Sequence, residues 1–133
     1  MVGYHTSKRN STQLITYTFR TAFVNRKASA GLVFHSDRGA QYTSYTLRNL
    51  LIKLQVTQSF SRPGVPHDNA VAESFFSTLK REFYYRTDFH SVKDMKQKLG
   101  DYIDFYNTIR PHKTLHYKTP NRFEQEYDEN YSV

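Results

Sequence analysis

The chain of 133 residues contains no cysteine, and it has no long apolar run. The first absence excludes disulfides, thiolate metal sites and cysteine nucleophiles, and it makes a reducing cytoplasm the expected compartment. Any metal ion must then be held by oxygen or imidazole ligands. The second absence excludes a membrane helix, which needs roughly 20 apolar residues, and residues 1–10 are too polar for a signal peptide. We expect a soluble cytoplasmic protein with no membrane partner.

Acidic residues are missing from the first 36 positions, so that Asp37 is the first carboxylate in the chain. Over the whole sequence 19 Lys and Arg residues face 12 Asp and Glu residues, which gives a formal net charge of +7. This balance suits a polyanionic partner. Because the basic residues are spread along the chain instead of forming one amphipathic stripe, nucleic acid is favoured over an acidic membrane surface.

Apolar periodicity predicts an alternation of strands and helices, with no internal repeat and no linker that would mark a second domain. The expected strands are residues 2–7, 32–35 and 56–61. The expected helices start near Ser11 or Thr12, near Thr43 or Ser44, at Asp68 or Asn69, near Ser91 and at Thr119–Pro120. Residues 62–67 hold two prolines and a glycine, which predicts a mobile loop. The pattern is typical of an α/β fold with at least partly parallel strands.

Two carboxylates with 35 residues between them stand in distinctive motifs: Asp37 in HSDRGAQY and Glu73 in DNAVAESFF. Asp37 follows an expected strand, and Glu73 lies about one turn inside an expected helix. Oxygen ligands of this kind hold Mg²⁺ or Mn²⁺. Two such ions about 4 Å apart can activate a water or a 3′-hydroxyl for in-line displacement at a phosphodiester. The pair therefore predicts metal-dependent cutting and joining of DNA.

Each carboxylate also has a simpler explanation when it is taken alone. Asp37-Arg38-Gly39 has the composition of an ordinary turn, and Glu73 would be favoured in the first turn of any helix by the helix dipole. The two motifs together, at this spacing and with their flanking residues, favour the metal site.

With these flanking motifs the chain resembles a known family, the DDE transposases of bacterial insertion sequences, which share the retroviral-integrase catalytic core. The resemblance is carried by residues 35–44 (HSDRGAQYTS), 61–70 (SRPGVPHDNA), 73–82 (ESFFSTLKRE) and 106–112 (YNTIRPH). It covers nearly the whole chain. It implies a ribonuclease H-like fold, DNA as the substrate and two Mg²⁺ or Mn²⁺ ions. It also implies that Asp37 and Glu73 are the second and third catalytic carboxylates.

The chain departs from the family at its first carboxylate. In the family this Asp lies on the first strand of the fold, and no acidic residue precedes Asp37 here. We therefore expect an N-terminally truncated core whose first and second strands are missing, with their places between the segments 2–7 and 32–35. In this division residues 1–88 are the core with the second and third carboxylates, and residues 89–133 are a C-terminal helical extension. Alone, the chain should be inactive in strand transfer and marginally folded.

Several cations are candidate contacts to DNA phosphates. Lys80 lies seven positions after Glu73, which places both on one helix face. The weaker candidates are Arg62, Arg81, Arg110 and Lys113. His35, His67 and His112 match no zinc spacing and are expected to shape a turn, a loop and the C-terminal segment. The rings are expected mostly in the core, where Phe75, Phe76 and Leu79 would anchor the Glu73 helix.

A second hypothesis makes the chain a non-catalytic DNA-binding or dimerising remnant that interferes with full-length transposase. A third, a structure-specific nuclease of the same fold, is disfavoured by the motif at residues 61–70. The expected partners are DNA and either full-length transposase or a separately encoded N-terminal part. By resemblance, the complete enzyme is expected to be a homo-oligomer. Its end recognition resides in a separate N-terminal region, so we expect no sequence-specific DNA binding from this chain.

Overall fold

The computed structural model describes residues 1–131, without the side chains of residues 66, 67 and 131. His67, one of the histidines considered above, therefore has its side chain outside the described part. The chain forms two compact units, Val2–Ser77 and Thr78–Val133, and Met1 belongs to the second. The boundary between them falls within one helix, α3 (Ala70–Glu82).

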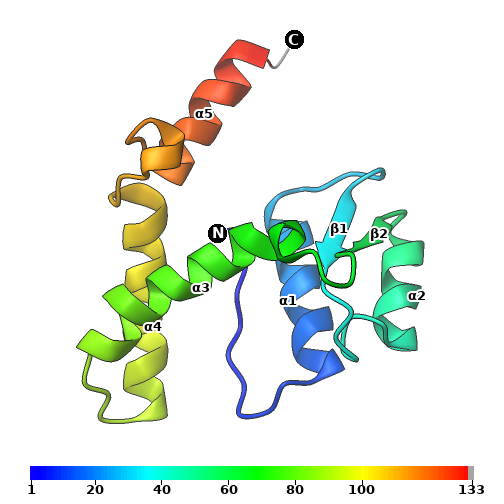
Figure 1. Ribbon diagram of the computed structural model, residues 1–133, viewed down its shortest axis with the longest axis horizontal. Helices are drawn as coiled ribbons and strands as arrows, with labels where there is room; N and C mark the ends of the chain where they lie inside the picture. Colours follow the sequence, from blue (N-terminus) through cyan, green and yellow to red (C-terminus); the bar gives the residue numbers. More distant parts are fainter. Residues whose placement is uncertain (132–133) are drawn as a thin grey trace. The chain divides into compact units, whose positions relative to one another are not determined.

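The sheet of the first unit has two parallel strands, β1 (Val33–Ser36) and β2 (Thr57–Phe60), with Val33 paired to Thr57 and Ser36 to Phe60. Parallel strands need a crossover, and here the helix α2 (Tyr45–Lys53) provides it (Figure 1). The parallel pairing and both strand positions confirm the sequence-based expectation within a residue or two.

Two capped helices pack together in this unit. Helix α1 (Thr12–Asn25) begins after Ser11, whose side chain accepts a hydrogen bond from the backbone of Leu14. Helix α2 begins in the same way after Ser44, which accepts from Leu47. Such caps satisfy backbone donors that have no partner inside the helix. Both helix starts were predicted correctly.

The core of the first unit is small and lies mainly between these helices. Its buried members are Phe19, Leu47, Leu50, Leu51 and Val56. Leu47 and Leu51 are almost completely enclosed, at 0% and 1% exposure. Partly buried residues, including Phe34 of β1, pack against this cluster.

The expected strand at residues 2–7 is not formed; the segment has no regular secondary structure. It lies along α1, where the His5 ring contacts Tyr17 with 4.3 Å between centroids and the His5 Nε2 lies 3.2 Å from Thr21 Oγ1. A Cβ on Gly3 would come within 2.9 Å of the Ala22 Cβ. A strand exists only through hydrogen bonds to a neighbouring strand, and within the described residues this segment has none.

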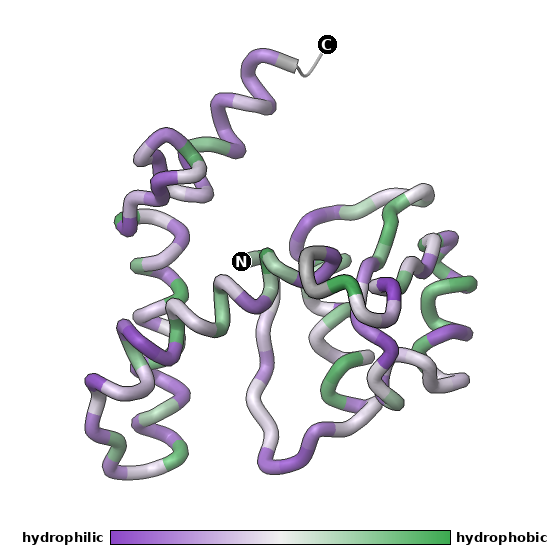
Figure 2. The backbone as a smooth tube through the Cα atoms, in the orientation of Figure 1, coloured by the Kyte–Doolittle hydropathy of each residue, from purple (hydrophilic) through white to green (hydrophobic). Residues whose placement is uncertain are grey.

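The second unit is helical. It holds the end of α3, then α4 (Val92–Thr108) capped by Ser91, and α5 (Pro120–Tyr131). The described residues also form three short 3₁₀ turns: η1 (Pro66–Asn69), η2 (Tyr84–Arg86) and η3 (Lys113–Leu115). Figure 2 shows that α5 is largely hydrophilic, whereas α2 carries many apolar residues. None of the described helices is long and apolar enough to cross a membrane.

The expectation that most aromatic rings lie in the core is wrong. Phe76 is 56% exposed, and α3 has no buried residue, although Phe75 and Leu79 are partly covered. Tyr45 and Tyr85 are exposed by 77% and 72%. The described elements are too few to cover all of the rings that stand at helical spacing.

Candidate functional site

Asp37 lies directly after the carboxyl end of β1, in a turn that fixes its carboxylate. Its Oδ1 accepts a 2.8 Å hydrogen bond from the backbone N–H of Gly39. A Cβ on Gly39 would lie 3.0 Å from both Asp37 Oδ1 and Gln41 Oε1. Any larger residue at position 39 would therefore make these two side-chain oxygens shift by a few tenths of an ångström, whereas glycine leaves the Asp37 carboxylate in place on the Gly39 N–H.

His35 connects β1 to the chain just before α3. Its Nε2 lies 3.1 Å from the carbonyl oxygen of Asp68, and its Nδ1 lies 3.0 Å from Ser59 Oγ on β2. A carbonyl can only accept, so Nε2 carries the proton and Nδ1 accepts from the serine. His35 thus helps to fix where the Glu73 helix starts, which fits a role in shaping the turn.

Arg62 and Asp68 close the proline-containing loop. The Asp68 carboxylate accepts from the backbone N–H of Arg62 at 2.9 Å and from its Nε at 3.1 Å. Hydrogen bonding from the Arg62 side chain is the main reason that the pKa of Asp68 is lowered. Helix α3 begins at Ala70, directly after Asn69, one of the two expected start positions. Asp68, the other, lies inside η1, and its carboxylate binds Arg62.

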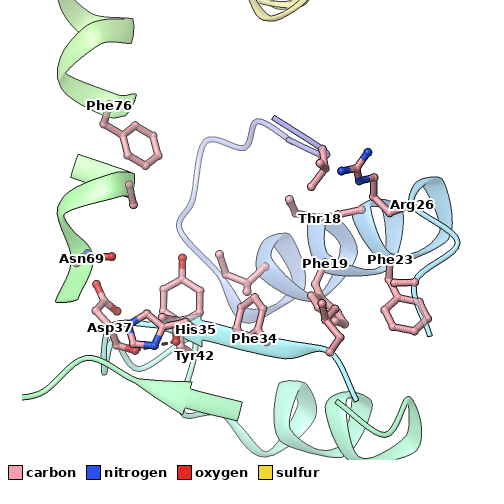
Figure 3. Close-up of a pocket in the computed structure, with 18 of the residues that line it drawn as sticks. Thr18, Phe19, Phe23, Arg26, Phe34, His35, Asp37, Tyr42, Asn69 and Phe76 are labelled. Atoms are coloured by element: carbon pink, nitrogen blue, oxygen red, sulfur yellow. Dashed lines mark hydrogen bonds between the residues drawn. The ribbon is translucent and has the colours of Figure 1, made fainter. Parts of the chain in front are cut away.

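Glu73 lies in the first turn of α3 and lines the same cavity as Asp37. This cavity, of about 800 Å³, is bounded within the first unit by residues 2–3, α1, β1 and the start of α3. Figure 3 shows Asp37 and Asn69 on the left of the cavity and the rings of Phe19 and Phe23 on its right. The structure therefore brings the two carboxylate residues to one cavity whose lining is partly polar and partly apolar.

Tyr42 is a further lining residue that sequence reasoning missed. Burial raises the pKa of its hydroxyl, and the negative charge of Asp37 raises this pKa further. No spacing rule would have selected Tyr42, because its position depends on how the Asp37 turn folds back.

The structure places the candidate DNA contacts in different surroundings. Lys80 and Lys113 are exposed. Arg62 is paired with Asp68 as described, and Arg81 Nη2 lies 3.9 Å from Glu82 Oε1. Arg110 is partly buried in a network described below. Their roles at DNA remain predictions.

Two sequence profiles identify the family of the chain. A sequence profile described as "Integrase core domain" matches residues 54–120, and a second profile of that description matches residues 1–66. The first match spans half of the chain. This chain belongs to the integrase core domain family. The two matches overlap at residues 54–66 and together cover residues 1–120.

Several of its curated relatives are transposases of insertion sequences. The chain is 38% identical over 126 residues to the transposase for IS904 from Lactococcus lactis. This match covers 94% of the present chain and 50% of that protein. It is 34% identical over 120 residues to the putative transposase InsK for IS150 from Escherichia coli, which matches 90% of this chain and 42% of that protein. The chain thus spans about half the length, or less, of these relatives.

The solved structures support the fold. The catalytic core domain of BIV integrase superimposes with a TM-score of 0.68 at 20% identity, over 97% of this chain and 80% of that one. This is an integrase catalytic core fold of the α/β class with a small parallel sheet, as the sequence predicted. At this identity the likeness concerns the fold alone.

The integrase-core residues fit part of a divalent metal site. Carboxylate oxygens are the donors that Mg²⁺ and Mn²⁺ prefer, and Mg²⁺ is commonly held by one or two carboxylates with waters and substrate phosphates. Asp37 and Glu73 supply such a pair. Among the side chains that the structure describes, however, no three from His, Asp or Glu gather closely enough to form a metal-binding group.

A second polar cluster lies in the second unit and was not predicted. Arg110 donates to both oxygens of Glu82, at 2.7 and 2.6 Å, and the Tyr102 hydroxyl donates to Glu82 Oε2 at 3.2 Å. Hydrogen bonding from Arg110 is the main reason that the pKa of Glu82 is lowered. Burial and the nearby Glu82 raise the pKa of Tyr102 to about 12. His112, whose Nε2 lies 3.2 Å from the carbonyl of Tyr106, completes the cluster.

Proposed function

We propose that this chain is part of the catalytic core of an insertion-sequence transposase, and that Asp37 and Glu73 are the carboxylates it contributes to metal-dependent DNA cleavage and strand transfer. The observation that carries the proposal is that both residues, which have 35 residues between them in the sequence, line one cavity. The family membership and the transposase relatives support it.

In the proposed mechanism each residue has a limited task. Asp37, held by the Gly39 N–H, and Glu73, placed by the first turn of α3, would hold the Mg²⁺ or Mn²⁺ ions. Such ions, when bound, polarise a scissile phosphodiester and lower the pKa of the attacking water or hydroxyl. The His35 bridge to Asp68 keeps the start of α3 at the carboxyl end of β1. The protein's contribution is thus the position of two oxygen ligands.

We also propose that the chain holds only part of the catalytic core, with the first carboxylate and the first and second strands lying outside it. The small sheet and the absence of an acidic residue before Asp37 support this. Residues 1–88 would then belong to the core with the second and third carboxylates, and residues 89–133 to a helical extension. The place of action would be the bacterial cytoplasm, where DNA is the partner.

A nicking assay tests this proposal. The purified chain, free of host nucleases, should not nick supercoiled DNA or join DNA ends in Mg²⁺ or Mn²⁺, because two carboxylates do not complete the site. The same assay on Glu73→Gln serves as the control for contaminating nuclease. Strong metal-dependent nicking that disappears in Glu73→Gln would show that the chain is a complete enzyme, and it would contradict the proposed division of the core.

DNA binding without sequence preference follows from the same proposal. Lys80 is exposed on α3, and its loss should weaken binding to all DNA sequences alike and reduce the salt dependence of binding. We expect Lys80→Ala to weaken binding several-fold in fluorescence anisotropy at low salt. Lys96→Ala, another exposed lysine on α4, is the matched control and should change binding less. Equal effects of the two variants on DNA binding would show that Lys80 contributes only its positive charge and makes no specific contact.

A further inference from the structure

Two neighbouring tyrosines of the second unit lie in solvent just after α3. Tyr84 and Tyr85 belong to the 3₁₀ turn η2, which lies in the connection between α3 and α4 (Figure 1). Tyr84 is 56% exposed and Tyr85 is 72% exposed. Their ring centroids lie 5.5 Å apart, and the ring planes are inclined by 71°. More than half of the surface of each residue is therefore open to a further partner.

The 3₁₀ turn explains why these rings are not in the core. The turn is tied to α3 by bonds from the Phe83 N–H to the Leu79 carbonyl and from the Arg86 N–H to the Phe83 carbonyl. A 3₁₀ helix has three residues per turn, so neighbouring side chains point about 120° apart. Phe83, at the start of the turn, is only 8% exposed and takes the inward direction. Tyr84 and Tyr85 must then point sideways and outward.

Covered rings hold Tyr84 in place. Tyr84 contacts Phe89 with 6.0 Å between centroids, and Phe89 contacts Phe83 with 5.5 Å between centroids. Phe83 in turn stacks on Tyr102 of α4, with 5.2 Å between centroids and 28° between planes. A tyrosine side chain has few rotatable bonds, and one that is already packed loses little conformational freedom when a ligand binds. The pair is thus a pre-formed aromatic surface.

Three exposed cations flank the tyrosine pair in the sequence: Lys80, Arg81 and Arg86. The carboxylate between them, Glu82, is bound on both oxygens by Arg110, which offsets its negative charge. The remaining carboxylate of residues 80–90 is Asp88, which is exposed. The segment that carries the two rings is therefore positively charged on balance, as a surface for a polyanion would be.

We propose that Tyr84, Tyr85 and the three cations form a stacking surface for single-stranded DNA, in which the rings stack on unpaired bases and the cations contact the phosphates. Single-strand sites generally combine basic side chains that follow the backbone with aromatic rings on which successive bases stack. The choice of DNA as the ligand rests on the proposed function, because strand cutting frees ends whose bases can unpair. The surface itself lies in the second unit and needs neither Asp37 nor Glu73.

Duplex DNA and a protein partner fit this surface less well. The bases of a duplex stack on one another and show only their edges in the grooves, so they offer no face to a tyrosine ring. The core of a protein interface is depleted of charged residues, whereas here exposed cations stand on both sides of the rings in the sequence. Unpaired nucleotides supply both the flat faces and the phosphates that the stacking surface suits.

Fluorescence anisotropy tests the inference. A fluorescein-labelled oligothymidylate of about 12 nucleotides, within the usual size of a single-strand site, and a duplex of equal length would each be titrated with the full chain at low salt. We expect Tyr85→Ala to weaken single-strand binding at least about five-fold, through the loss of one stacked base, and to change duplex binding by less than about two-fold.

Two control variants separate stacking from other effects. Tyr85→Phe keeps the ring and should bind the single strand within about two-fold of the wild type, because stacking needs only the ring face. Tyr45→Ala removes a tyrosine that is 77% exposed on α2, in the other unit, and should change neither affinity.

Photocross-linking of the unaltered chain gives a second measurement that needs no variant. A single 5-iododeoxyuridine in the same oligonucleotide reacts, on near-ultraviolet irradiation, with aromatic side chains that lie against the base. Mass spectrometry of the digested product should find the cross-link on Tyr84 or Tyr85.

The inference is overturned if the wild type does not bind the single strand, if Tyr85→Ala weakens single-strand and duplex binding alike or neither, or if the cross-links fall only on other residues. A dimer that Tyr85→Ala dissociates in sedimentation would also overturn it, because the rings would then contact a second copy. Tyrosine-dependent binding in a chain without a shared metal site at Asp37 and Glu73 would leave the stacking surface standing and count against the proposed function alone. A shared metal site without such binding would count against the stacking surface alone.

Discussion

Replacing Leu47 by alanine should remove most of the stability of the Val2–Ser77 unit. Leu47 is 0% exposed and lies in a buried cluster that includes Phe19 and Leu51. Truncating such a leucine costs about 2–5 kcal/mol, from lost burial and from the cavity that remains. Small domains have little stability to lose. We therefore expect the wild type to unfold in a broad transition with a low midpoint, and Leu47→Ala to show no cooperative transition. Circular dichroism during thermal and urea unfolding measures both.

The control for this prediction lies on the same helix. Ile52 is 65% exposed, so Ile52→Ala removes a similar side chain from the surface of α2 and should shift the transition only slightly. A Leu47→Ala protein that unfolds with the wild-type midpoint would show that the buried cluster does not hold the unit together. A sharp, highly cooperative wild-type transition would contradict the expectation of marginal folding.

Replacing Arg110 by methionine should destabilise the second unit by about 1–3 kcal/mol, because it leaves a partly buried carboxylate without its main partner. Arg110 bonds both oxygens of Glu82, and the two side chains are 21% and 27% exposed. Urea unfolding followed by NMR signals of α4 would measure the loss. Lys98→Met is the control: it removes a single hydrogen bond to Asp94, one helical turn away, and Asp94 keeps the bond from the His90 N–H, so the midpoint should move less.

The pH dependence of stability distinguishes an electrostatic effect of Arg110 from an effect of its packing. The pKa of Glu82 is lowered from its ordinary value of 4.5, chiefly by Arg110. A lowered pKa stabilises the folded state above the unfolded-state value and loses this contribution as the pH falls through the folded-state pKa. The stability difference between wild type and Arg110→Met should therefore be constant above about pH 5 and shrink as the pH falls below 4.5. A difference that does not change with pH would mean that Arg110 acts through packing.

Local signals predicted the helices well. Ser11, Ser44 and Ser91 each precede an amphipathic run and each accepts a backbone hydrogen bond at a helix start. These features depend on neighbours in sequence. The strand at residues 2–7 was predicted on the same grounds and was wrong, because a strand depends on a partner that local sequence does not specify.

The candidate site was predictable for a different reason. The strand before Asp37 and the helix around Glu73 were both recognisable, and the carboxyl end of a strand next to a helix start can bring two side chains to one cavity. The bonds from His35 to Asp68 and from Arg110 to Glu82 were not predictable, because they join positions 33 and 28 residues apart whose residue types have many alternative partners.

Paramagnetic broadening by Mn²⁺ tests most directly whether Asp37 and Glu73 share a metal. In ¹⁵N-labelled full chain, millimolar Mn²⁺ should broaden the amide signals around Gly39 and those around Glu73 together. Asp37→Asn keeps an acceptor for the Gly39 N–H but loses the charge, and it should abolish the broadening at both places, as should Glu73→Gln. Asp104→Asn, an exposed carboxylate on α4, should have no effect. Broadening near Glu73 that survives in Asp37→Asn, or broadening at neither place in the wild type, would contradict a shared site.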